Sequence, residues 1–133
     1  MQVNEFRLKL FVRNFENMRE FYTIVLGFEP VGGWDNGPDD CGVLLDTGSG
    51  IVELISAGSE YKLVQGCDVS LGVDDVWKLW EELKSQSIVH PLRQNYWGDS
   101  SFCIRDPEGF RLTFFSKDKA RVTDGSQSEE NIL

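Results

Sequence analysis

The stretch FCIRDPEGFRL, residues 102–112, decides how this chain folds. Apolar residues lie on both sides of the tetrapeptide DPEG, residues 106–109. A proline followed by a glycine within one tetrapeptide is typical of a reversal between two strands. We therefore predict a hairpin with strands over 102–105 and 110–115, and we interpret Asp106 as a turn residue rather than a catalytic one.

Upstream of this hairpin the pattern indicates one helix and two more strands. Val69, Leu71 and Val73 alternate with polar residues, which is the period of a strand. Asp74 then precedes apolar positions at helical spacing up to Leu83, so it is expected to cap a helix. With a strand over 88–92, the second half of the chain reads βαβββ.

The first half repeats that order. A strand is expected over 6–12, followed by a helix that begins after Asn14 and ends at Gly27. A short strand over 28–31, a Gly-rich loop over 32–40 and strands over 41–45 and 50–55 complete the half. When Val12 is aligned with Val73, the two halves superpose almost without gaps, and Asp46 and Asp106 open the same turn. We interpret this as a duplicated module, with a polar connection over 57–66.

Composition excludes several classes of protein. The 133 residues are 41% hydrophobic, too many for a disordered chain, and the net charge of −9 opposes binding to the phosphates of nucleic acid. The three cysteines form no CxxC pair and are interpreted as reduced thiols. No apolar run reaches membrane-span length and no signal peptide is recognisable, so we expect a cytoplasmic protein. The polar tail over 117–133 is expected to be disordered.

Several motifs together resemble the vicinal oxygen chelate superfamily, which includes glyoxalase I, bleomycin-resistance proteins, fosfomycin-resistance enzymes and extradiol dioxygenases. They are FYTIVLGF at 21–28, VDDV at 73–76, YWG at 96–98 and the stretch at 102–112. The resemblance implies an α+β fold of two tandem βαβββ modules, about 5–57 and 67–116, forming a curved mixed sheet around a cavity in one domain, 1–116. It also implies a homodimer.

The resemblance further implies that each module contributes one ligand from its first strand and one from its fourth. Those positions are Arg7, Glu53, Asp68 and Thr113. Arginine would repel a metal ion, threonine is a weak donor, and the single histidine, His90, lies elsewhere. We therefore predict neither a resident metal nor a cofactor, although a hard cation held by Glu53 and Asp68 remains an alternative.

Strand alternation gives each predicted sheet one apolar face and one mixed face. The predicted ligand-binding residues of the mixed faces are Arg7, Lys9, Phe11, Glu53, Asp68, Ser70, Arg111 and Thr113. A solvated antiparallel face would carry the same pattern. If buried, the two arginines would need Glu53 and Asp68 as partners. Trp34 and Trp97, in otherwise polar segments, are expected to contact a flat ligand, or else to pack within their loops.

Three functions fit these features. We favour a metal-independent small-molecule binder of the antibiotic-sequestering type, which holds a cationic aromatic compound. The alternative is a divalent-metal-dependent lyase, isomerase or dioxygenase of the glyoxalase type, with Glu53 as metal ligand or catalytic general base. The third is a ligand-binding module with no role in resistance.

Overall fold

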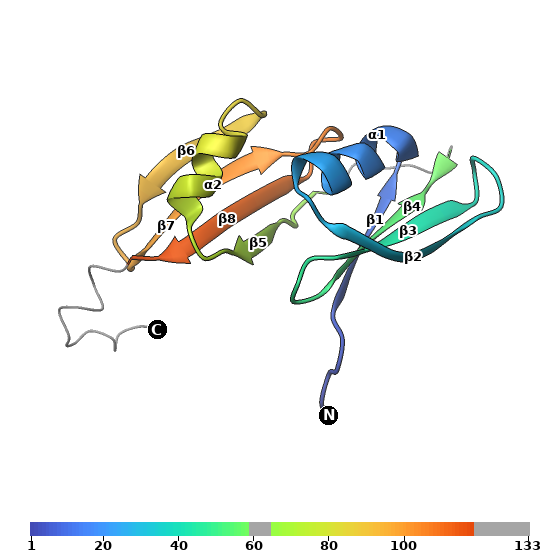
Figure 1. The fold of residues 1–133 in the computed structure, drawn as a ribbon, viewed down its shortest axis with the longest axis horizontal. Coiled ribbons are helices and arrows are strands. Elements are labelled where there is room, and N and C mark those ends of the chain that lie inside the picture. Colours follow the sequence, from blue (N-terminus) through green and yellow to red (C-terminus); the bar gives the residue numbers. More distant parts are fainter. Residues whose placement is uncertain (59–64, 119–133) are drawn as a thin grey trace. The chain divides into compact units, whose positions relative to one another are not determined.

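A computed structural model describes residues 1–58 and 65–118 (Figure 1). It has the expected α+β fold, two βαβββ modules that each form a four-stranded mixed sheet. By contacts the chain divides into two compact units. The first comprises residues 1–65 and the turn Asp106–Gly109, and the second comprises residues 66–105 and 110–133. Of the tail predicted to be disordered over 117–133, Lys117 instead ends a strand and Asp118 is buried, and the rest lies outside the described residues. Most of the connection over 57–66 also lies outside them.

The first unit holds its strands in the order β1-β4-β3-β2. They are β1 (Arg7–Val12), β2 (Glu29–Asp35), β3 (Cys41–Asp46) and β4 (Ile51–Ser56). β1 runs parallel to β4, and the other neighbours are antiparallel. The apolar face expected from alternation is confirmed, since Leu10, Val12, Val52 and Leu54 are buried and Leu8 is half-buried. Strand β3 adds the buried Val43 and Leu45 to the same face.

The helix of this unit changes type along its length. Asn14 caps α1 (Phe15–Glu20), as predicted, with its side chain accepting a hydrogen bond from the Asn17 backbone N–H. A π-helical turn, η1 (Phe21–Val25), follows, and Gly27 reverses the chain with φ of +79°. Only a residue tolerant of the left-handed region ends a helix this way without strain.

The second unit has the strand order β5-β8-β7-β6. Its elements are β5 (Val69–Gly72), α2 (Val76–Leu83), β6 (Ile88–Gln94), β7 (Asp99–Arg105) and β8 (Arg111–Lys117). Trp80 of α2 packs edge-on against Phe102, with ring centroids 5.2 Å apart, and Phe102 stacks on Phe114 at 5.3 Å. The aromatic side chains therefore fill the core between helix and sheet.

Several predicted boundaries were wrong, including the ends of β6 and β8, which extend to Gln94 and Lys117. The N-cap of α2 is Asp75 rather than Asp74, because the Asp75 carboxylate accepts the Lys78 backbone N–H. β7 begins at Asp99 rather than Phe102, since the buried Ser100 and Ser101 find hydrogen-bond partners in Asp118 and Asn95. β2 extends to Asp35 through the predicted loop.

The duplicated turn is confirmed in atomic detail. The Asp46 carboxylate accepts the backbone N–H of Gly48 at 2.8 Å, and the Asp106 carboxylate accepts that of Glu108 at 2.9 Å. Each aspartate thus bonds to the backbone two residues ahead, which is the turn-forming habit of this side chain. The last hairpin of each module is therefore closed by the same hydrogen bond, from a backbone N–H to the aspartate two residues before it.

Candidate functional site

The mixed face of the first sheet brings together five of the predicted ligand-binding residues. Lys9 is the cross-strand partner of Glu53, and Phe11 is the partner of Ile55 one row further along. That row continues through Gly42 to Trp34. Cross-strand partners share a face, so Arg7, Lys9, Phe11, Glu53 and Trp34 lie on one surface.

Glu53 is the most enclosed charged group of this surface. Its side chain is only 12% exposed, and its carboxylate lies 3.8 Å from Nη1 of Arg7. Arg7 is itself shared, because its Nη2 donates to the Glu5 carboxylate at 3.3 Å. Within residues 1–58 and 65–118, Glu53 accepts no hydrogen bond, so its charge is weakly compensated.

Two aromatic rings lie at the two ends of the row that contains Ile55. The Lys9 ammonium lies 5.7 Å from the centroid of the Phe11 ring, and Phe11 is about half exposed. The Trp34 indole covers Gly42, where a Cβ atom would overlap it, and its N–H donates to the Asp40 carboxylate at 3.0 Å. Trp34 was predicted in a mobile loop, but strand β2 and this hydrogen bond hold it in place.

The other predicted residues belong to the second unit. Ser70 and Thr113 are cross-strand partners on its mixed face. Asp68 precedes β5 and lies 3.6 Å from Nε of Arg111. Each arginine thus lies near one of the two carboxylates, although Arg7 and Arg111 are about half exposed rather than buried. Trp97 is 59% exposed in the turn between β6 and β7, where its ring packs edge-on against Tyr96.

These residues do not fit a resident divalent ion. The carboxylate of Glu53 faces the guanidinium of Arg7, a cation in the place where a metal would need to bind. Asp68 is likewise paired with a cation, Arg111, at 3.6 Å. In the described part of the chain, no three His, Cys, Asp or Glu side chains are grouped so as to hold a metal ion.

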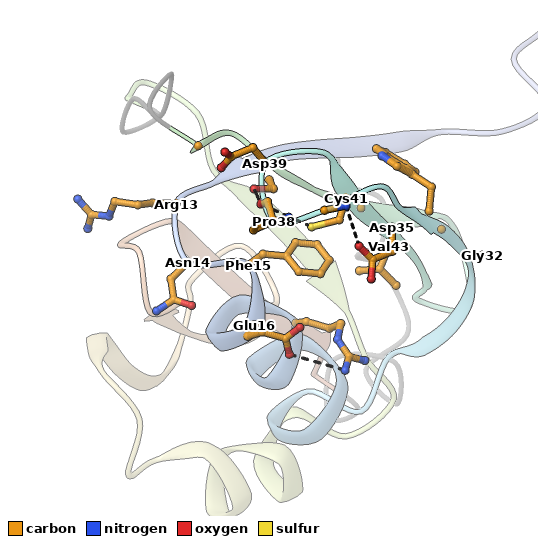
Figure 2. Close-up of a pocket in the computed structure, with 17 residues that line it drawn as sticks. Arg13, Asn14, Phe15, Glu16, Gly32, Asp35, Pro38, Asp39, Cys41 and Val43 are labelled. Carbon is orange, nitrogen blue, oxygen red and sulfur yellow. Dashed lines mark hydrogen bonds and ion pairs between the residues drawn. The ribbon is translucent and has the colours of Figure 1, made fainter.

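A groove that the sequence did not predict lies in the first unit (Figure 2). It has a volume of about 1160 Å³ and runs between α1 and the β2–β3 hairpin. Phe15 points toward Cys41 and Val43, and Glu16 lies on the helix side. Arg19 of α1 also lines the groove. Trp34 also lines the groove, whereas Arg7, Lys9, Phe11 and Glu53 do not.

The Cys41 thiol that lines the groove is not activated as a nucleophile. Burial raises the pKa of the Cys41 thiol, and the nearby carboxylates of Asp35 and Glu16 raise it further. The neutral thiol is a poor nucleophile. The groove could not be found from sequence, because helix spacing identifies Phe15 only as apolar and gives Glu16 and Asp35 as ordinary surface residues.

A second buried contact links Tyr22 to the turn at 106–109. The Tyr22 hydroxyl donates to the Asp106 carboxylate at 2.8 Å, and both residues are buried. The Glu108 carboxylate accepts the backbone N–H groups of Arg13 and Asn14, at the start of α1. Tyr22 is therefore a core aromatic with a satisfied hydroxyl, and Asp106 serves the turn as predicted.

No helix among the described residues is long and apolar enough to cross a membrane. No curated protein matches the sequence.

Several solved structures resemble this chain. TioX from Micromonospora sp. ML1 is 23% identical, with a TM-score of 0.72, over 87% of this chain and all of that one.

A lactoylglutathione lyase from Agrobacterium tumefaciens is 17% identical with a TM-score of 0.67, over 86% of this chain and 94% of its own. A superfamily member from Sphaerobacter thermophilus DSM 20745 is 19% identical with a TM-score of 0.68, over 87% and 98%. At these identities the likeness shows the fold alone. The family model described as Glyoxalase/Bleomycin resistance protein/Dioxygenase superfamily matches residues 4–114. The chain therefore belongs to the glyoxalase/bleomycin-resistance/dioxygenase superfamily.

Proposed function

We propose that this protein binds a small, flat, cationic molecule without a metal ion, in the manner of an antibiotic-sequestering protein. The observation that carries the proposal is that the Glu53 carboxylate is enclosed and its charge is only weakly compensated. Its side chain is only 12% exposed, and its single ion pair within the described residues is with Arg7 at 3.8 Å. A carboxylate removed from water is costly unless it is hydrogen-bonded or paired. A ligand cation would supply the missing partner.

The neighbouring rings support the aromatic part of the proposal. Phe11 and Trp34 lie in the row next to Glu53, and the Lys9 ammonium already lies over the Phe11 ring. An aromatic face attracts a cation through its quadrupole, and a flat ligand gains further by stacking. The acidic net charge of −9 favours approach of a cation.

Calorimetric titration with proflavine, a flat aromatic cation, tests the proposal. Glu53→Gln keeps the shape and removes the charge, so we expect affinity to fall about tenfold, as for loss of a charged hydrogen bond. Glu5→Gln is the matched control, because Glu5 also pairs with Arg7 but is 46% exposed. The control is expected to bind proflavine as the unaltered chain does.

Metal analysis separates this function from the alternative enzyme. Protein purified without chelator is expected to carry no stoichiometric transition metal. About one equivalent of Zn, Ni, Mn or Fe per chain, lost in Glu53→Ala, would contradict the proposal and favour a lyase, isomerase or dioxygenase. If no flat cation in a thermal-shift panel binds, the antibiotic-type function is wrong and an unspecialised binding module remains.

We also propose that the chain forms a homodimer. Membership of the superfamily supports this assembly. Sedimentation velocity at micromolar concentration tests it, and a monomer at every concentration would contradict it.

A further inference from the structure

Two arginines stand directly opposite each other on the second sheet. Arg105 ends β7, Arg111 begins β8, and the two are cross-strand partners. Like charges in this position lie about 5 Å apart at Cβ and destabilise a strand pair. The corresponding hairpin of the first unit is closed by Asp46 and Ile51, which do not repel each other. The arginine pair is therefore not required by the hairpin.

Only one of the two positive charges has a partner. Arg111 lies 3.6 Å from the Asp68 carboxylate, and both side chains are about half exposed. The side chain of Arg105 is exposed and makes neither an ion pair nor a hydrogen bond within the described part of the chain. The carboxylates of Asp106 and Glu108 already accept hydrogen bonds in the first unit. One guanidinium is left uncompensated in a protein that is acidic as a whole.

Further donors lie beside this pair. Thr113 is two residues along β8 from Arg111, on the same face, and Ser70 is its cross-strand partner. Two residues of strand span about 7 Å, which an arginine side chain can reach across. Neither hydroxyl makes a hydrogen bond to another described residue. The surface thus offers two guanidinium groups and two hydroxyls.

From this juxtaposition we propose that the mixed face of the second sheet binds an oxyanion, the carboxylate or phosphate group of a small molecule, between Arg105 and Arg111. A guanidinium presents a planar fork of N–H donors that matches the two oxygens of such a group. The hydroxyls of Thr113 and Ser70 supply additional hydrogen bonds. This site lies in the other unit from the proposed cation site and does not depend on it.

Phosphate and acetate, titrated separately into the full chain at constant ionic strength, test the site. The readout is the arginine Nε–Hε signals in ¹⁵N NMR spectra. We expect saturable shifts at Arg105 and Arg111, with the tighter of the two anions identifying the class of ligand. Arg105→Gln is expected to weaken binding about two- to fivefold, the range for an exposed ion pair.

Lys84→Gln is the matched control. Lys84 is 52% exposed at the end of α2, close to the 49% of Arg111, and it pairs with Glu81. Its replacement should leave anion binding unchanged. Equal weakening by both substitutions, or no saturable shift up to ~100 mM of either anion, would overturn the site. Glu53→Gln should bind phosphate normally, so failure of the oxyanion site is distinguishable from failure of the cation site.

Discussion

A single buried hydroxyl illustrates what a side chain can contribute to this fold. Tyr22 is fully buried and donates to Asp106, which is 84 residues further along the chain. A buried tyrosine usually finds a hydrogen-bond partner for its hydroxyl. The sequence could not indicate that partner, because no periodicity or spacing relates positions so far apart.

Replacing Tyr22 with phenylalanine should therefore be costly. The change removes one donor and leaves the buried Asp106 carboxylate short of a hydrogen bond, so we expect a loss of about 1–3 kcal/mol in the free energy of unfolding. Urea titration followed by circular dichroism measures it. Tyr96→Phe is the control, since Tyr96 is 87% exposed, and it should change stability by less than about 0.5 kcal/mol. Equal effects of the two substitutions would contradict this role of Tyr22.

The same hydroxyl predicts how stability varies with pH. Burial, with the charge of Asp106 next in importance, raises the pKa of Tyr22 well above its ordinary value of 10.0. The folded chain therefore holds the phenolic proton more tightly than the unfolded chain does. The resulting stability is complete below pH 10.0 and is lost as the pH rises above it. Tyr22→Phe should show a shallower alkaline loss in urea titrations at successive pH values, and an unchanged slope would contradict the assignment.

Strand β2 shows why the sequence predicted only the first part of one element, residues 28–31. All seven of its residues are exposed and two are adjacent glycines, so it lacks the alternation that marks a half-buried strand. Its pairing with β3 comes from backbone hydrogen bonds along a sheet edge. The buried strands, by contrast, were predictable from their apolar period. The enclosure of Glu53 was not, because it depends on neighbours from other strands.

The packing of Trp34 in β2 against Gly42 in β3 predicts a loss of stability on one substitution. Gly42→Ala would place a methyl group inside the Trp34 indole, so we expect a loss of about 1–3 kcal/mol, typical of overpacking. In a Trp34→Ala background the same substitution should cost much less, because the obstacle has gone. Urea titration of the four proteins in this cycle measures the coupling. If Gly42→Ala costs the same in both backgrounds, the indole does not lie against Gly42.

The chain as a whole is less divisible than its repeat suggests. The sequence predicted two modules with the same order of helix and strands, and each module forms its own sheet. The turn Asp106–Gly109 nevertheless belongs with the first unit, where it bonds to Tyr22 and to the start of α1. A repeat alignment compares local patterns, so it does not reveal that a turn from one repeat has joined the other.

This exchange predicts that residues 1–65 do not fold alone. The fragment lacks Asp106, which bonds to Tyr22, and Glu108, which bonds to the backbone of Arg13 and Asn14. A chain of this length is only marginally stable even with all its contacts. We expect no cooperative thermal transition for fragment 1–65. Mixing it with fragment 66–133 should restore one, as followed by circular dichroism. A sharp, dispersed NMR spectrum of fragment 1–65 alone would contradict the expectation.

The unequal exposure of the three thiols has a practical consequence. Cys41 and Cys103 are buried. Cys67 is exposed and lies between β4 and β5 in the sequence. A maleimide dye or spin label applied to the native protein should therefore attach at one position. That position supplies a spectroscopic reporter for ligand titrations without any engineered cysteine.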